Sequence, residues 1–260
     1  MSVHVSSPGS SPSDTSWALM TGSPSGIGRA TALGLARDGY ALIVTGRDKG
    51  RAAGCRRSIE SSGGRAIDLV ADLADPSAVR TLIGQVREAI DGPLDVLVHN
   101  ACGGSFAPTE ATPEAMFDTA FNVHAKAPFL LTAAFAPTMA ERGHGAIMNV
   151  GSLSTITAAS GTCAFQASRA ALSMMTKSWT AEYGPRGVRV NSVDHGFILT
   201  RVDQDIRDMF GTYLASLPAG RGGDPEEVAN VIRFPVSPQA SYVNGATLAV
   251  DGGKNAVVVM

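Results

Sequence analysis

The chain has few cysteines, no long apolar run and no excess of charge of one sign. Its 260 residues include 3 cysteines, and none of them belongs to a CxxC pair. Such a sparse, odd set excludes a disulfide framework and a zinc site built on cysteine pairs, and it favours a reducing compartment. We therefore expect a cytoplasmic protein without a structural metal.

No apolar run reaches the roughly 18 to 20 residues that a membrane-spanning helix needs. The first segment, residues 1–16, is rich in Ser, Pro and Gly and lacks the basic start and apolar core of a signal peptide. We expect this segment to be a disordered tail. Residues 17–260 are expected to form one soluble domain that does not bind membranes.

Acidic and basic residues are interspersed, and the formal net charge is only -2. This balance gives no basic face for nucleic acid and no polybasic patch for an anionic membrane. A small molecule is therefore the expected partner. The length and the 44% share of hydrophobic residues suffice for one large core.

Short apolar runs alternate with segments of helical period from Trp17 onward, which is typical of βαβ units. The pattern predicts a single α/β domain with a seven-stranded parallel sheet flanked by helices. Helices are expected at residues 26–38, 113–140, 164–184 and 225–234. The expected strands are WALMTG, ALIVTG, AIDLVADL, LDVLVHNA, GAIMNVGS, RVNSVDHG and ATLAVDGG.

One long stretch, residues 197–223, shows no clear period. It carries the punctuating residues Gly211, Pro218, Gly220, Gly222 and Gly223. In a parallel sheet such a loop usually lies over the ligand crevice at the carboxyl ends of the strands. We expect it to be irregular and to form a lid over the substrate.

A glycine-rich turn, TGSPSGIG, follows the first expected strand and opens the first expected helix. Gly22, Gly26 and Gly28 let the backbone turn sharply and approach a pyrophosphate, whose charge the helix N-terminus meets. An ordinary glycine-rich turn is the alternative. The strand and helix context favours dinucleotide binding.

The end of the second expected strand, VTGRD, indicates which dinucleotide binds. An acidic residue there would bind the ribose 2′-hydroxyl of NAD, whereas an arginine accommodates a 2′-phosphate. Gly46 and Arg47 stand at this point, so NADP(H) is the expected cofactor. The alternative is that Arg47 is only a surface charge, because Asp48 follows it.

The spacing TGxxxGxG resembles the short-chain dehydrogenase/reductase family, and further motifs follow in order as far as Gly253. They are ADL, HNACG, FNVHAKAPFLLT, NVGSLS, AEYGPRGVRVNSV and VDGG. The resemblance implies a Rossmann-type, doubly wound domain and a homotetramer or homodimer. It also implies a cofactor-binding set, namely Gly22, Ser25, Gly26, Ile27, Gly28, Arg47, Asp72, Leu73, Asn100, Ala101, Arg169 and Gly196.

In that family a serine polarises a carbonyl, a tyrosine exchanges the proton, a lysine binds the nicotinamide ribose and an asparagine supports a water relay. The resemblance assigns the serine to Ser152 and the asparagine to Asn122, whereas Phe165 and Arg169 stand at the tyrosine and lysine positions. Phe165 has no ionisable group and cannot protonate an alkoxide. Arg169 can bind ribose hydroxyls but stays protonated, so it cannot relay a proton.

After the sixth expected strand the family usually has Pro-Gly, whereas this chain reads Asp194-His195-Gly196. An imidazole titrates near neutrality and can act as an acid or a base. His195 is therefore a candidate proton donor, and a structural histidine at a strand end is the alternative. His99 is expected to tie neighbouring strands together. His124 is expected to be structural and to lie near subunit contacts.

Three functions remain open. The favoured one is an NADP(H)-dependent oxidoreductase that acts on a small hydrophobic carbonyl or enone-type metabolite, with proton delivery by water, Ser152 or His195. The second is a non-redox cyclase, isomerase or dehydratase on the same scaffold, and the third is a catalytically silent binding protein. A closing lid would gather Phe165 with Phe106, Phe197 and Met209, which favours a hydrophobic substrate.

Overall fold

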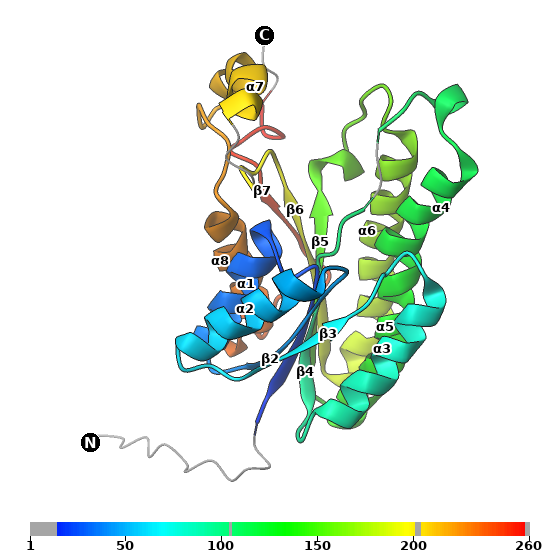
Figure 1. The fold of residues 1–260 in the computed structure, drawn as a ribbon, viewed down its shortest axis with the longest axis vertical. Helices are drawn as coiled ribbons and strands as arrows, with labels where there is room; N and C mark the ends of the chain where they lie inside the picture. Colours follow the sequence, from blue (N-terminus) through cyan, green and yellow to red (C-terminus); the bar gives the residue numbers. More distant parts are fainter. Residues whose placement is uncertain (1–14, 104–105, 201–203, 258–260) are drawn as a thin grey trace.

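The computed structural model describes residues 15–103, 106–200 and 204–257. They form a sheet of 7 strands in the order β3-β2-β1-β4-β5-β6-β7, and every neighbouring pair is parallel. Helices cover both faces of this sheet (Figure 1). The predicted α/β fold class is confirmed. The expected tail, residues 1–16, falls almost wholly outside the described residues.

Each of the expected apolar runs overlaps one strand, and β6 begins one residue before its run. The strands are β1 Trp17–Thr21, β2 Ala41–Gly46, β3 Ala66–Val70, β4 Leu94–His99, β5 Gly145–Ser152, β6 Val188–His195 and β7 Thr247–Val250. The central strands are apolar on both faces because helices cover both sides of the sheet. In β1, Leu19 packs into one core and its neighbour Met20 into the other.

The helices form two layers (Figure 1). One face of the sheet carries α1 Gly26–Arg37, α2 Lys49–Ser61 and α8 Pro225–Val236. The other carries α3 Pro76–Ala89, α4 Glu114–Phe121, α5 Ala127–Glu141 and α6 Cys163–Tyr183. Within the described residues, no helix has the length and apolarity needed to cross a membrane.

The central helix predicted over residues 113–140 is interrupted. A π-helical turn at Asn122–Lys126 separates α4 from α5. A π-helical turn is rare and often marks a functional position. The period of the sequence could not reveal it, because one wide turn shifts the apolar pattern by a single residue.

The stretch 197–223, expected to be irregular, contains helix α7 Gln204–Ser216. Leu214 within α7 and Leu217 after it are buried, which explains why this part folds back onto the domain. The helix accommodates Gly211 in its interior, where a glycine costs only about 1 kcal/mol. The first part of the expected lid includes residues 201–203, which lie outside the described residues.

Candidate active site

Two adjoining pockets lie where the strand order reverses. Strand β1 stands between β2 and β4, and ligands of such sheets bind at this point, beyond the carboxyl ends of the strands. The Arg47 pocket, of about 480 Å³, is lined by residues that include Gly22, Arg47, Asp72, Leu73, Ala101 and Cys102. The Arg169 pocket, of about 810 Å³, includes Gly22, Ser25, Gly28, Cys102, Arg169 and His195. Gly22 and Cys102 belong to both, so the two pockets form one cleft.

The glycines of the first turn have no room for side chains. Gly22 has φ +65°, and a Cβ atom there would lie 2.8 Å from the Asn100 side chain. At Gly28 a Cβ would lie 2.2 Å from the carbonyl oxygen of Gly22. At Gly26, with φ +51°, it would lie 2.9 Å from Thr200. The turn is therefore tight enough to bring backbone amides to the edge of the cleft.

The N-terminus of α1 points into this cleft. Its N-cap, Ser25, makes no capping hydrogen bond with its side chain, and the first turn holds no acidic residue. Ile27 lines the same pocket. Unpaired amides and the positive end of the helix dipole together make an anion site. A dinucleotide pyrophosphate fits this position.

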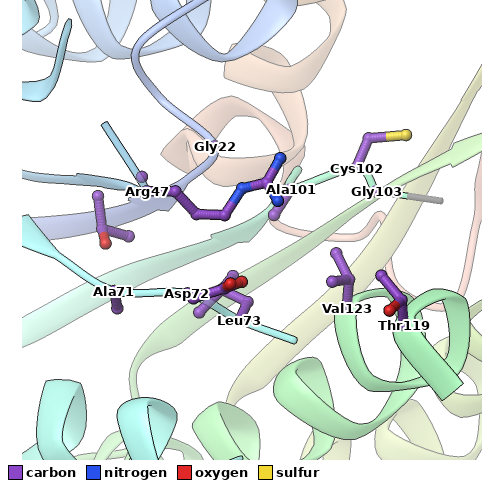
Figure 2. A pocket seen from close by; sticks show the side chains of 12 residues that line it. Gly22, Arg47, Ala71, Asp72, Leu73, Ala101, Cys102, Gly103, Thr119 and Val123 are labelled. Atoms are coloured by element: carbon purple, nitrogen blue, oxygen red, sulfur yellow. The ribbon is translucent and has the colours of Figure 1, made fainter. Parts of the chain in front are cut away.

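Arg47 reaches across the Arg47 pocket. In Figure 2 its side chain runs from the end of β2 towards Ala101, while Asp72 and Leu73 lie on the opposite side. The carboxylate of Asp72 accepts a hydrogen bond from the Ala74 amide at 3.0 Å, which holds the turn after β3. The pocket therefore presents a guanidinium and a carboxylate from opposite sides.

Asn100 ties the end of β4 to the glycine turn. Its Nδ2 donates to the carbonyl oxygens of Thr21 at 2.9 Å and Gly22 at 3.2 Å. The backbone amides of Asn100 and Ala101 donate to the Thr21 hydroxyl. Asn100 also lines the Arg169 pocket. Its visible role is to hold the turn in place.

Arg169 is buried at the far end of the cleft, with 2% of its surface exposed. Its Nη1 donates to the Val150 carbonyl oxygen of β5 at 2.8 Å. Its Nε is buried without a hydrogen-bond partner. The guanidinium is thus fixed to the sheet on one side and retains a spare donor.

His195 lies beside Ser152, because the two residues are register partners on β6 and β5. Its Nδ1 contacts the Gly196 carbonyl oxygen at 2.8 Å. A carbonyl can only accept, so Nδ1 carries the proton and Nε2 carries a lone pair. Burial lowers the pKa of the imidazole, and Arg169 lowers it further against the effect of the Gly196 bond. The neutral ring is therefore a base rather than an acid at neutral pH.

The backbone of Gly196 is also fixed. Its amide donates to the Val250 carbonyl oxygen at 3.0 Å. A Cβ atom at this position would lie 2.8 Å from the Asp251 backbone. The close approach of two chain segments therefore requires a glycine after His195.

Phe165 stands in a ring of aromatic and charged neighbours. The rings of Phe106 and His124 meet it edge-on, each with centroids 5.3 Å away. The Arg169 guanidinium lies 5.5 Å from its centroid. The surroundings of this position are therefore apolar on two sides and cationic on a third.

The Asn122 side chain is committed elsewhere. Its Nδ2 donates to the Ala74 carbonyl oxygen at 3.0 Å, which joins the π-helical turn to the segment after β3. The water-relay role expected from the resemblance would have to use the remaining polar groups of Asn122. The π-helical turn is the feature that orients this side chain.

His124, expected near subunit contacts, is fully buried inside the domain. The Gly103 amide donates to its Nε2 at 3.1 Å, so its Nδ1 carries the proton and donates to the Ser168 hydroxyl at 2.8 Å. Burial lowers the pKa of this imidazole to about 3. His124 therefore braces α6 behind Phe165.

His99, expected to tie strands together, instead joins β4 to a helix. Its Nε2 lies 3.0 Å from the hydroxyl of Thr132 in α5. Burial lowers the pKa of this imidazole to about 3. Both histidines are thus neutral parts of the interior.

The lid helix packs on Phe197, which follows β6. The Phe197 ring lies 4.8 Å from Phe210 and 6.2 Å from Tyr213. The ammonium group of Lys254 lies 5.6 Å from the Tyr213 ring. The Met209 side chain, expected to join Phe165, lies outside the described part of the structure. The aromatic contacts of Phe197 therefore belong to the lid.

One residue that sequence reasoning did not single out as functional, Asp194, lies near the end of β6. Asp194 is 3% exposed, and its Oδ2 accepts a hydrogen bond from Thr155 at 2.5 Å. Asp194 was noted only as a departure from the usual Pro-Gly pattern. A buried carboxyl group beside the cleft is visible only in the folded chain.

Sequence comparison shows to which protein family the chain belongs. A family model described as Enoyl-(Acyl carrier protein) reductase matches residues 22–255. The chain belongs to the short-chain dehydrogenase/reductase family. This membership confirms the resemblance seen in the motifs.

Members of the short-chain dehydrogenase/reductase family match this chain over nearly its whole length. The chain is 35% identical to the 3-oxoacyl-[acyl-carrier-protein] reductase FabG of Thermotoga maritima, over 90% of this chain and 96% of the relative. It is also 35% identical to a galactitol 2-dehydrogenase (L-tagatose-forming) of Cereibacter sphaeroides, over 92% and 95%. Both relatives are named as oxidoreductases, and neither name favours a non-redox reaction.

A solved structure of a gluconate 5-dehydrogenase from Burkholderia cenocepacia, in complex with NADP and tartrate, superposes with a TM-score of 0.86. The two sequences are 32% identical over 94% of this chain and 97% of that one. The fold of the oxidoreductases in this family therefore extends over the whole cleft described above.

Proposed function

We propose that the protein is an NADP(H)-dependent oxidoreductase that acts on a small hydrophobic carbonyl or enone-type metabolite without a tyrosine proton donor. The observation that carries the proposal is the single cleft in which the uncapped N-terminus of α1 and the Arg47 side chain open onto the same space. One end of this cleft suits a pyrophosphate and the other suits a phosphorylated ribose.

The Arg47 pocket supports NADP(H) over NAD(H). A guanidinium binds a phosphate through charge-assisted hydrogen bonds, and Arg47 lies where a 2′-phosphate would be placed. Gly46, the last residue of β2, supplies no carboxylate for a ribose hydroxyl. The gluconate 5-dehydrogenase that resembles this chain was crystallised with NADP.

Different residues of the chain would bind the cofactor and polarise the substrate at different points along the cleft. The amides at the start of α1 would bind the pyrophosphate, with Gly22, Gly26 and Gly28 leaving room for it. When bound, the nicotinamide would supply a hydride. Ser152 would donate a hydrogen bond to the substrate carbonyl, and the buried charge of Arg169 would favour negative charge that develops nearby.

The surroundings of Phe165 support a hydrophobic substrate. Phe106 is 65% exposed and meets Phe165 edge-on, so an apolar molecule can cover both rings. Reduction of an enone gives an enolate that does not require a phenol for protonation. The substitution at this position is therefore compatible with hydride transfer to a conjugated system.

The test measures cofactor binding and turnover separately. We expect calorimetry to show NADPH binding, and we expect absorbance at the nicotinamide band to fall with at least one member of a panel of enones and hydrophobic ketones. Product formed without NADPH consumption would instead establish the non-redox reaction. Failure to bind either dinucleotide would overturn the proposal.

We also infer that the chain assembles into a homodimer or homotetramer. Large apolar side chains are exposed on three neighbouring helices, namely Phe117 of α4, Phe129 of α5 and Met174 of α6. Burying such a face is favourable at about 25 cal/mol per Å². Light scattering coupled to gel filtration should show two or four copies, and a monomer that persists at high concentration would contradict this inference.

A further inference from the structure

Gly46 ends β2 at the edge of the Arg47 pocket and has no room for a side chain. Its φ angle lies outside the left-handed region, so the backbone there would accept a residue with a side chain. A Cβ atom at this position, however, would lie 2.7 Å from Cγ and 2.9 Å from Cδ of Pro24. The Pro24 ring, and not the backbone conformation, therefore requires a glycine at this position.

The Pro24 ring cannot turn away from position 46. Its side chain closes on its own backbone nitrogen, so it has no freely rotating bond. The residue before it is tied to β2, because the Ser23 amide and hydroxyl both donate to the Thr45 carbonyl oxygen, at 3.2 Å and 3.3 Å. The Cys55 thiol of α2 donates to the Ser23 carbonyl oxygen at 3.4 Å. These contacts fix the ring from the side of the glycine-rich turn.

The end of strand β2 is constrained as well. β2 pairs with β1 on one side and with β3 on the other. The Ala71 amide donates to the Gly46 carbonyl oxygen at 3.2 Å, which holds the last residue of the strand in place. A side chain at position 46 would therefore press against two fixed segments. Extra atoms in such a place force shifts of the backbone and destabilise the fold.

Position 46 is also where a side chain would distinguish the two nicotinamide dinucleotides. Gly46 lines the Arg47 pocket together with Arg47 itself. A carboxylate at the end of this strand would accept a hydrogen bond from the ribose 2′-hydroxyl of NAD(H), and it would repel the 2′-phosphate of NADP(H). The residue that occupies the space beside Gly46 therefore affects which dinucleotide binds.

We propose that Pro24 determines cofactor specificity by keeping position 46 free of a carboxylate. The proposal rests on the proposed function, because it concerns which dinucleotide the cleft binds. Pro24 lines neither of the two pockets and acts through position 46, so it is a positioning residue. Arg47 attracts the 2′-phosphate, and Pro24 excludes the acidic residue that would bind the ribose of NAD(H). The attraction and the exclusion come from different segments, so separate substitutions can remove them.

Thermal unfolding of the cofactor-free protein tests the packing. Gly46→Ala adds only a Cβ atom and should lower the melting temperature by several degrees in the chain that keeps Pro24. In the Pro24→Ala background, the same substitution should lower the melting temperature much less, measured against Pro24→Ala alone. Gly84→Ala in α3 is the matched control, because no atom lies within 4 Å of its Cβ position. Its effect should be the same in both backgrounds.

Titration calorimetry with NADPH and NADH tests the specificity. Gly46→Asp alone should bind both dinucleotides weakly, because the new side chain displaces the glycine-rich turn. Gly46→Asp combined with Pro24→Ala should bind NADH about tenfold more tightly than Gly46→Asp does, and NADPH about tenfold more weakly than the wild type. A merely structural role of Pro24 would restore stability in the double variant without reversing the preference between the dinucleotides.

Three results would overturn the proposal. The first is an equal loss of melting temperature from Gly46→Ala with and without Pro24, because the ring would then not be what fills the space. The second is an NADH affinity of the double variant no higher than that of Gly46→Asp. The third is a Gly46→Asp chain that stays unfolded even with Pro24→Ala. Failure of the wild type to bind NADPH would instead refute the proposed function, while the melting temperatures would still report on the packing of Pro24.

Discussion

Phe165 differs from a tyrosine by one oxygen atom, and that atom would bring a titratable hydroxyl group to this position. Its neighbours Phe106 and His124 offer no charge, and Arg169 is held by the Val150 carbonyl oxygen. A phenol placed there would meet a guanidinium that can lower its pKa but cannot pass on a proton. The residue alone therefore does not define a ketoreductase site.

We predict that Phe165→Tyr will not create an efficient reductase of simple ketones. The double variant Phe165→Tyr with Arg169→Lys should exceed either single variant, because a lysine can both bind ribose and tune the phenol. NADPH oxidation with simple ketones measures the effect. A single variant as active as the double one would contradict the argument.

Arg47 governs the choice of cofactor in this proposal. We predict that Arg47→Ala weakens NADPH binding by about 1.5 to 3 kcal/mol, the usual contribution of hydrogen bonds to charged groups, and leaves NADH binding nearly unchanged. Titration calorimetry with both dinucleotides measures the difference. Arg37→Ala, at the far end of α1, serves as the control and should leave both affinities unchanged. An Arg47→Ala variant that keeps its preference would remove Arg47 from the site.

At the scale of elements, helix α7 forms in a stretch that its glycines led us to expect to be irregular. Gly211 lies in the interior of α7, and no atom lies within 4 Å of the position that its Cβ would take. Leu214 and Leu217 supply the buried contacts that keep the helix on the domain. Tertiary packing therefore overrides the unfavourable propensity of one residue.

We predict that Gly211→Ala stabilises α7 by roughly 0.5 to 1 kcal/mol, since a helical alanine loses less conformational freedom. Hydrogen exchange of the α7 amides measures this local effect. Gly39→Ala is the matched contrast, because Gly39 also has open space around it but has φ +96°. It should destabilise the protein by roughly 1 kcal/mol or more. Equal effects of the two substitutions would show that backbone conformation does not decide the outcome.

At the scale of the whole molecule, two histidines make the fold sensitive to acid. His99 at the end of β4 and His124 in the π-helical turn are both buried. Burial lowers the pKa of each imidazole from 6.5 to about 3. Their neutral forms are therefore part of the folded state. Protonation in the unfolded chain draws the equilibrium towards unfolding.

The lowered pKa values of the two histidines predict how the free energy of unfolding changes with pH. Stability contributed by these histidines is present above pH 6.5 and is lost as pH falls from 6.5 towards 3. Each should add a slope of about 1.4 kcal/mol per pH unit within that window. Urea unfolding at a series of pH values measures it. His99→Gln should flatten the slope by one proton. A slope in His99→Gln that is parallel to that of the wild type would refute the assignment.

The sequence by itself determined the fold class, the seven strands and the glycine turn, because apolar period and turn chemistry are local properties of the chain. It also established that the side chain of Phe165 has no ionisable group that could donate a proton. These features depend on residues within a few positions of one another. The same holds for Arg47, which follows its strand directly.

Only the tertiary structure decided which distant residues share the site. Gly151 and Asp194 become neighbours because β5 and β6 pair in parallel at one register. A π-helical turn aims Asn122 at Ala74, and burial makes His124 a neutral brace of Ser168. Parallel strands join residues across long connections, and a register shift of one residue would exchange the faces of every side chain. The arrangement of residues around the cleft therefore depends on the packed sheet, which no local pattern in the sequence specifies.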